Sequence, residues 1–420
     1  MKKLHRAALL TSTLATCFMA SAHAGPMVWA SMGEDAYRFL RRAGADLQQV
    51  EPFSVSIRAP QADGRVGRRD ETVYLMQVDE DALPQLSRDV HEKLGNCAGF
   101  MVHATRAEGR QAVQGFREAA QRGVKPLISY AIDNDAEVTP LLSQIQESNI
   151  RATIEQLSTG YKNRYYTTSG GVSASDQLAA SWRALAGSRT DVTVSQFTHP
   201  SWPQKSVILE IKGTTNPGKI VVIGGHLDSI LLSGTNENSI APGADDDASG
   251  VASLQEAMRV LLSSGYKPKR TLQFMAYAAE EVGLRGSQGI ATDYKNKGKK
   301  VVGVLQLDMT NYQGSSSDIT MITDYTNSAQ NKFVKDLAAH YLPTLKVNED
   351  RCGYACSDHA SWTNKGYVAS FPFEAPLAND NKLIHTSNDT LAKSGNNANH
   401  ALKFSKLALA YLVELGSDGK

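Results

Sequence analysis

Hydrophobic and polar positions divide the chain into two stretches with different patterns. In residues 25–130, short alternating and amphipathic segments predict a small α+β module. The predicted strands cover 28–32, 53–57, 72–78 and 99–104, and the predicted helices cover 37–42 and 81–94. Residues 62–71 are rich in glycine and charge, so we expect a hairpin or loop there. His91 and His103 have no carboxylates at metal-binding spacing and are expected to be surface or core histidines.

The second stretch has longer and more regular elements, and a junction is expected at residues 127–137. Predicted helices cover 141–157, 173–185, 332–341 and 401–415, and another follows Asp247. Predicted strands cover 192–197, 206–211, 220–223, 271–279, 301–307, 319–323 and 366–373. Strands that alternate with helices indicate an α/β fold with an open, mostly parallel sheet and helices on both faces.

Composition excludes several classes of partner. The chain has 420 residues, 41% of them hydrophobic, which is enough for a large core and a second module. The net charge of +1 does not favour binding to nucleic acid or to an anionic membrane. Beyond the N-terminus, no apolar run is long enough to span a bilayer.

The N-terminus has the three features of a secretory signal peptide. Basic residues at Lys2, Lys3 and Arg6 precede an apolar run at 7–20, and Ala22-His23-Ala24 matches the small-x-small cleavage pattern. We therefore expect residues 1–24 to be removed and the protein to be secreted; a structural helix is the alternative. Cys17 follows Thr16, a poor residue before a lipoprotein cysteine, so ordinary cleavage is favoured.

Export would place the protein in an oxidising compartment, where cysteines pair. Cys352 and Cys356 delimit a short loop that could close as a disulfide, which leaves Cys97 as an odd cysteine. The odd cysteine would be harmless if its segment were removed. We therefore interpret residues 25–130 as a propeptide and 131–420 as the site-bearing domain; a permanent structural module is the alternative.

Histidine, aspartate and glutamate residues that could bind metal or carry protons lie mainly where predicted strands end. His226 and Asp228 follow the strand at 220–223, three aspartates stand together at 245–247, and a loop carries His385. Glu280-Glu281 and Asp308 follow two further predicted strands. Carboxyl ends of parallel strands lie at one edge of a sheet, so these groups can converge. One imidazole and one carboxylate for each ion, with a shared carboxylate, suit two zinc ions.

Glu280 and Glu281 are adjacent, so in an extended segment their side chains point to opposite sides. One can bind metal while the other faces water as a proton carrier. A solvated strand end is the alternative for such a pair taken alone. The number of acids and imidazoles at successive strand ends favours the metal interpretation.

Residues 138–420 resemble the bacterial leucyl aminopeptidases, which are secreted two-zinc exopeptidases. The resemblance rests on GGHLDS, APGADDDASG, MAYAAEEVGLRGSQ, LQLDMTNY, CGYACSDHASW and the segment at His385. It implies that Asp246 bridges two zinc ions, with Glu281 and His385 completing one site. It further implies His226 and Asp308 for the other ion, Glu280 as general base, and Asp228 as the acid that orients His226.

The same resemblance implies a disulfide between Cys352 and Cys356 and an N-terminal propeptide that assists folding and restrains activity. It also implies an apolar pocket for the substrate side chain, for which ordinary core packing is the alternative. The pocket residues would be Met309, Ile322, Tyr354, Phe371, Phe373 and Ile384. Residues 377–380 depart from the family, which has aromatic residues at the pocket rim; this departure concerns the breadth of side-chain preference.

These observations predict a secreted metallo-aminopeptidase, expected to be a monomer activated by a processing protease, that removes apolar N-terminal residues, leucine foremost. Its substrates would be peptides with free N-termini. A carboxypeptidase or aminoacylase on the same scaffold is the runner-up, but it needs a cation for the substrate carboxylate, and Arg285 is the only arginine within the core motifs. A non-catalytic binding protein is disfavoured because the expected ligands and base are intact.

Overall fold

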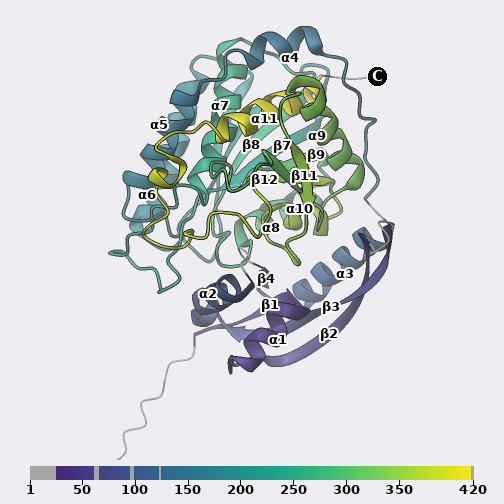
Figure 1. Cartoon of the computed structure of the whole chain (residues 1–420), viewed down its shortest axis with the longest axis vertical. Helices are drawn as coiled ribbons and strands as arrows, with labels where there is room; N and C mark the ends of the chain where they lie inside the picture. The colour runs from purple at the N-terminus through teal and green to yellow at the C-terminus, as the bar shows by residue number, and fades with distance from the viewer. Residues whose placement is uncertain (1–24, 61–65, 95–98, 123, 418–420) are drawn as a thin grey trace, which may run out of the picture.

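The computed structural model describes residues 25–60, 66–94, 99–122 and 124–417, arranged around two separate sheets (Figure 1). The expected signal peptide and Cys97 lie outside these residues. In the described part of the chain, no helix is both long and apolar enough to cross a membrane.

The N-terminal module consists of a four-stranded antiparallel sheet and three helices. Its strands pair in the order β2-β3-β1-β4. In chain order the elements are β1 (Met27–Gly33), α1 (Glu34–Arg42), β2 (Gln48–Pro60), β3 (Val66–Asp79), the short 3-10 helix η1 (Glu80–Ala82), α2 (Leu83–Leu94), β4 (Phe100–His103) and α3 (Arg106–Arg122).

The hairpin expected around residues 62–71 is present and longer than predicted: β2 and β3 pair antiparallel, and β3 already begins at Val66. One helix of the module differs from expectation. Helix α3 was not predicted, and it packs against β2 at the side that faces the larger domain (Figure 1).

The larger domain is built on an eight-stranded mixed sheet with the order β11-β10-β12-β9-β7-β8-β6-β5. Its four central strands, β8, β7, β9 and β12, are mutually parallel, whereas β6 and β10 run antiparallel to their inner neighbours. The strands are β5 (Val192–Phe197), β6 (Ser206–Ile211), β7 (Asn216–His226), β8 (Arg270–Tyr277), β9 (Lys300–Gln306), β10 (Ile319–Ile322), β11 (Val347–Asp350) and β12 (Ala369–Phe373).

Helices cover both faces of this sheet, as the alternating pattern predicted (Figure 1). On β7, Val221 and Ile223 belong to the large core cluster on one face, whereas Ile220 and Val222 belong to the cluster on the other. The helices are α4 (Asp135–Leu142), α5 (Glu147–Thr159), α6 (Ser169–Ala186), α7 (Ala248–Ser263), α8 (Arg285–Asn296), α9 (Ser328–Tyr341), α10 (His359–Asn364), the 3-10 helix η2 (Leu391–Ser394) and α11 (Ala401–Gly416).

The single helix expected at 141–157 is two helices, α4 and α5. The break is held by Glu256 of α7, whose carboxylate accepts a hydrogen bond of 2.8 Å from the backbone N–H of Gln146. Helices α8 and α10 and strand β11 were also not predicted. The fold class itself is confirmed: an open, mostly parallel α/β sheet positions the strand ends that carry the site.

Candidate active site

Three neighbouring parallel strands deliver the predicted site residues to one edge of the sheet. Strand β7 ends at His226, the loop after β8 carries Glu280 and Glu281, and Asp308 comes just after β9. His385 lies in the loop after β12. The side chains of these residues are at most 4% exposed, so the structure buries the predicted group together.

Asp246 lies between the two imidazoles. Its Oδ1 is 2.8 Å from Nε2 of His226, and its Oδ2 is 2.9 Å from Nε2 of His385. His385 Nε2 is also 2.8 Å from Glu281 Oε2, and His226 Nε2 is 3.5 Å from Asp308 Oδ1. One carboxylate is therefore shared, and each imidazole has a further acid beside it, which is the arrangement expected for two ions.

The nitrogen and oxygen atoms at the centre are better suited to coordinating metal ions than to forming hydrogen bonds with one another. Buried atoms without a hydrogen-bond partner of acceptable geometry in the described chain include Asp246 Oδ2, both carboxylate oxygens of Glu281, Asp308 Oδ1 and Nε2 of His385. Buried polar atoms are rarely left unpaired, so such a group points to a missing cation. Imidazole nitrogen and carboxylate oxygen are donors that zinc accepts.

The pKa values of the buried groups also show why this site favours a bound cation. Burial raises the pKa of Glu281 to about 7, and it raises the pKa of Glu280 well above its usual range. Burial alone would lower the pKa of His385, but the carboxylates of Glu281 and Asp246 outweigh it and raise that pKa to about 10. So many carboxylates in one dry site hold protons unless a cation neutralises them.

Asp247 has a different task from Asp246, although its oxygens also lie near His226 and Asp308. Its carboxylate accepts backbone N–H groups from His226 (2.9 Å), Gly250 (2.8 Å) and Met309 (3.1 Å). These bonds occupy its lone pairs and cap α7. We therefore assign Asp247 to holding the loops, and Asp246 to the space between the imidazoles.

Asp228 lies near His226 but contacts it mainly through its backbone. Nδ1 of His226 is 3.1 Å from the Asp228 carbonyl oxygen and 3.6 Å from its Oδ1. The carboxylate instead accepts the backbone N–H groups of Glu280 (2.9 Å) and Glu281 (3.2 Å). The expectation that this carboxylate orients His226 is thus only partly matched, since its hydrogen bonds go to the Glu280–Glu281 peptide.

Several residues at the centre have backbone conformations that are rare for residues with a side chain. Ala279, Met309 and His385 have positive φ angles of 54°, 54° and 57°. They stand directly before Glu280, directly after Asp308, and at a predicted ligand. Such conformations occur mainly where surrounding structure enforces them, and they cluster at functional sites.

The residues predicted to line the apolar pocket, Tyr354 excepted, pack together in one buried cluster, which Met309 connects to Asp308 of the centre. One buried cluster contains Met309, Ile322, Phe371, Phe373 and Ile384, with Leu377 packed against it. Cys352 and Cys356 belong to the same cluster and are disulfide-bonded, with an S–S distance of 2.08 Å. Tyr354 is placed differently: it packs in a separate cluster with Phe116 of α3, and its hydroxyl donates to Ser31 Oγ of β1 at 3.0 Å.

Sequence reasoning assigned no role to four residues around the centre, although Asp389 was noted four positions after His385. The Ser357 hydroxyl donates to Asp308 Oδ2 at 2.5 Å, and Asp389 accepts the backbone N–H groups of Asp245 and Asp246. Asp358 is fully buried, and burial raises its pKa to about 7. Ser357 and Asp358 lie in CGYACSDHASW, so the motif gave a signal for them.

Arg164, the fourth, had no such signal. Its fully buried guanidinium donates to the carbonyl oxygens of Leu227 (2.8 Å), Pro242 (2.5 Å) and Gly243 (2.9 Å). The side chain thereby joins the loop after β7 to the loop that leads into Asp246.

The N-terminal module covers the site. The His91 ring on α2 lies 4.7 Å, centroid to centroid, from the His385 ring. Arg88 donates to the carbonyl oxygen of Leu232 at 3.1 Å, and the backbone N–H of Val102 donates to the Gly283 carbonyl at 3.0 Å. Helix α2 and the edge strand β4 therefore contact the loops that carry the predicted ligands.

Fold and centre together define a candidate metal-dependent hydrolase. Residues 206–411 match the family model described as Peptidase family M28. A probable leucine aminopeptidase of Arthroderma benhamiae is 36% identical over 339 residues, which are 78% of this chain and 88% of that protein. Leucine aminopeptidase 1 of Penicillium rubens is 36% identical over 299 residues, which are 68% of this chain and 76% of that protein. The chain belongs to peptidase family M28 and is an enzyme of that family.

Among solved structures, the LapA aminopeptidase of Legionella pneumophila superposes with a TM-score of 0.77 and 28% sequence identity. The match covers 94% of this chain and 100% of that chain. Residues 131–420 make up only 290 of the 420 residues, so the similarity extends into the N-terminal module.

Proposed function

We propose that the enzyme is a two-zinc aminopeptidase that removes N-terminal residues with apolar side chains, leucine foremost. The observation that carries the proposal is the position of Asp246 between His226 and His385, with nitrogen and oxygen atoms on both sides that lack well-formed hydrogen bonds. The names of the fungal relatives, which are leucine aminopeptidases, support the choice of substrate.

Asp246 would be the shared ligand, His226 and Asp308 would complete one zinc site, and Glu281 and His385 would complete the other. Zinc bound there would supply Lewis acidity, which lowers the pKa of water toward about 7 and polarises a peptide carbonyl. Glu280 has an unpaired, buried Oε1 beside these ligands. It would accept a proton from the attacking water and pass it to the leaving amine.

The apolar pocket supports a preference for leucine. The cluster of Met309, Ile322, Phe371, Phe373 and Ile384 contains no charged side chain, and its member Met309 directly follows Asp308 in the chain. Leu377 packs against this cluster, at a position where the family resemblance leads us to expect an aromatic residue. A smaller rim residue leaves more room, so we propose that other aliphatic side chains are also accepted.

Metal removal tests the function. The mature enzyme treated with o-phenanthroline should lose hydrolysis of leucine anilide, and added zinc should restore it, with two zinc ions per chain by elemental analysis. N-acyl-leucine should not be cleaved, because an acylated substrate has no free amine. Full activity in a metal-free preparation would contradict the proposal, and cleavage of N-acyl-leucine would favour the aminoacylase alternative.

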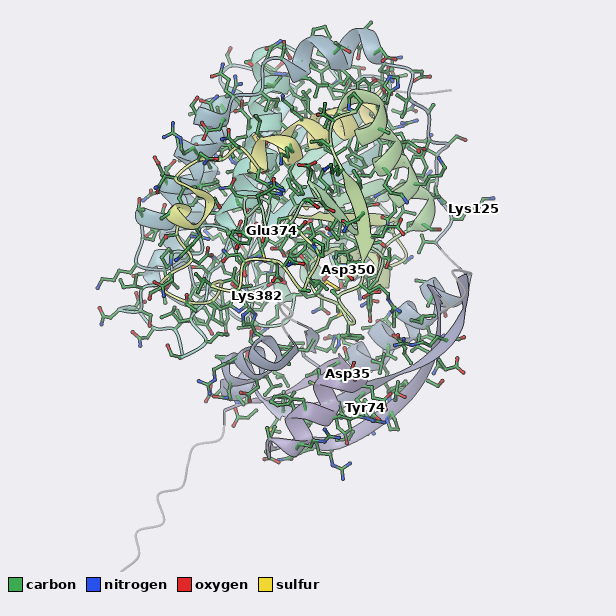
Figure 2. All side chains as sticks on the ribbon, viewed as in Figure 1. Asp35, Tyr74, Lys125, Asp350, Glu374 and Lys382 are labelled. Carbon is green, nitrogen blue, oxygen red and sulfur yellow. A yellow bond between two sulfur atoms is a disulfide. The ribbon has the colours of Figure 1, made fainter. Side chains whose placement is uncertain are left out.

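We further propose that residues 1–24 direct secretion and that residues 25 to about 127 are an inhibitory propeptide. The contact between His91 and His385 supports this, as does the near-complete burial of the ligands with the module in place. A cleft of about 650 Å³ lies between module and domain, with Asp35 on one side and Lys382 on the other (Figure 2). It reaches Tyr354 and Leu377, but the ligands stay buried.

The linker after α3 suggests where the cut falls. Ile128, Tyr130 and Ile132 pack against the core of the larger domain, so those residues belong to the mature enzyme. Lys125 is exposed and lies at the edge of the molecule, on the segment that connects α3 to the larger domain (Figure 2). Leu127, on the same segment, is 59% exposed. We propose cleavage by a processing protease between Val124 and Leu127.

Limited proteolysis tests this role. Cleavage in the linker should raise kcat/KM for leucine anilide, and mass spectrometry of the active product should place its N-terminus at residue 125, 126 or 127. In the uncleaved chain, His91→Ala should raise basal activity, whereas Gln85→Ala on the exposed side of α2 should not. Equal turnover of cleaved and uncleaved enzyme would show that the module does not inhibit. Size-exclusion chromatography of the product tests the expected monomer.

A further inference from the structure

Arg285 of the larger domain forms an ion pair with the N-terminal module and stacks on two aromatic rings. Its guanidinium Nη1 is 2.7 Å from Glu80 Oε1 of the module, and the Arg285 side chain is only 11% exposed. The guanidinium carbon also lies 4.6 Å from the ring centroid of Trp202 and 5.9 Å from that of Tyr166. An arginine stacked on aromatic rings is oriented before any carboxylate arrives.

This arginine is fixed beside the catalytic loops. Its backbone N–H donates to the carbonyl oxygen of Ala279 at 3.0 Å, directly before Glu280. The aromatic residues under its guanidinium belong to one buried cluster with Ala279, Val282 and Ile230. Ile230 is two residues beyond Asp228. The guanidinium therefore stands at the margin of the same loops that form the metal centre.

The module places a carboxylate and an imidazole on the two ends of one helical segment. Glu80 begins η1 and pairs with Arg285, whereas His91 near the end of α2 contacts His385. Eleven residue steps along η1 and α2 separate them, which is roughly 16 to 18 Å at about 1.5 Å per α-helical and 2.0 Å per 3-10 residue. The segment formed by η1 and α2 thus spans the site from a predicted metal ligand at one end to a cation at the other.

We propose that Arg285, once the module and Glu80 have left, binds the C-terminal carboxylate of the peptide substrate. This inference rests on the proposed aminopeptidase function. Glu80 occupies that place in the uncleaved chain, while the Trp202 and Tyr166 rings remain to hold the guanidinium. An extended peptide advances about 3.3 Å per residue, so a span of roughly 16 to 18 Å corresponds to about five residues. The preferred substrates are therefore short peptides with a free C-terminus.

A matched series of leucine-led glycine peptides tests the proposal on the cleaved enzyme. Peptides of two to six residues are compared as free acids and as C-terminal amides, and the readout is the acid-to-amide ratio of kcat/KM at each length. We expect this ratio to peak at about five residues, at about tenfold, which corresponds to one charge-assisted hydrogen-bonded contact. Because each enzyme serves as its own reference, a general loss of activity does not disturb the ratio.

Arg285→Met should reduce the ratio to about one at every length, and Arg285→Lys should retain part of it. Arg183→Met, at an exposed position on α6, is the control and should keep the wild-type ratio. A wild-type ratio near one at all lengths, or a ratio that survives in Arg285→Met, would overturn the proposal and leave Arg285 as an anchor for the module. Failure of the wild-type enzyme to cleave any leucine-led substrate would instead contradict the aminopeptidase function.

Discussion

Asp228 accepts a hydrogen bond from the backbone amide of Glu280, with 2.9 Å between Oδ1 and N. The same carboxylate accepts the amide of Glu281, so the loop after β8 is tied to the end of β7 at the peptide that joins the two glutamates. The directions of the two neighbouring side chains are thereby set by a third residue on another strand.

Glu280 and Glu281 should respond differently to the same substitution. Glu280→Gln should keep both zinc ions and the melting temperature but lower kcat by about 10²–10⁴, the usual contribution of a general base. Glu281→Gln should lose zinc and melt earlier, because Glu281 lies against His385. Zinc content, thermal melting and kcat on each variant check this. If Glu280→Gln loses an ion while Glu281→Gln retains two, the assigned roles are reversed.

Arg164→Lys should weaken the metal site without touching a ligand. Lysine cannot reproduce the fork that joins the carbonyls of Leu227, Pro242 and Gly243, and it would leave buried acceptors unpaired. A loss of roughly 3 kcal/mol in unfolding free energy is expected, together with faster loss of zinc to a chelator. Arg151→Lys on the surface of α5 is the control. Unchanged zinc retention in Arg164→Lys would mean that the two loops hold their positions independently.

The Cys352–Cys356 bond should matter more for substrate choice than for stability. It closes a short loop, so its effect on unfolding free energy should stay below the ~3 kcal/mol expected for a 15-residue loop. Both cysteines pack in the pocket cluster. The Cys352→Ser/Cys356→Ser double variant should therefore lose selectivity for leucine anilide over alanine anilide. Alkylation of the denatured wild type should find no free thiol at either position; two free thiols would contradict the pairing.

His103 should make the uncleaved chain sensitive to acid. Burial, with a smaller effect from Lys365, lowers the pKa of His103 to about 3, so the folded state holds a neutral ring against Ser31. Below about pH 6.5 the unfolded chain binds a proton that the folded chain does not, so stability falls as pH decreases toward 3. The slope is at most about 1.4 kcal/mol per pH unit for one histidine.

Melting of the uncleaved chain between pH 7 and pH 4.5 measures this effect. His103→Gln should show a shallower decline, since glutamine can hydrogen-bond to Ser31 without titrating. The other buried histidines are present in both proteins, so their contribution to the dependence of stability on pH is the same in both. Parallel declines in the two proteins would show that His103 does not contribute.

The sequence predicted the sheet edge well because one rule governs it: parallel strands end on the same side. His226, the two glutamates and Asp308 could be placed together on that ground alone. The roles of three adjacent aspartates could not be separated this way. Asp247 differs from Asp246 through amides of residues such as Met309, 62 positions away, and no local pattern contains that information.

The same limit explains the errors in the elements. The break between α4 and α5 depends on Glu256, which is distant in sequence from Gln146. Arg164 gave no local signal, because a buried arginine that binds only carbonyl groups looks in sequence like any surface arginine. Tyr354 was expected in the side-chain pocket, but its hydroxyl binds Ser31, a partner 323 positions earlier.

The hydrogen bonds of Asp389 also determine how late during synthesis of the chain the site can form. Asp389 holds the backbone of Asp245 and Asp246, and His385 stands beside Asp246, yet both residues are made about 140 positions later. A growing chain therefore lacks His385 and Asp389, and with them the proposed second ion site, until nearly all of it has emerged. By the proposed mechanism, an unfinished or C-terminally truncated polypeptide would be inactive, whatever the state of its N-terminal module.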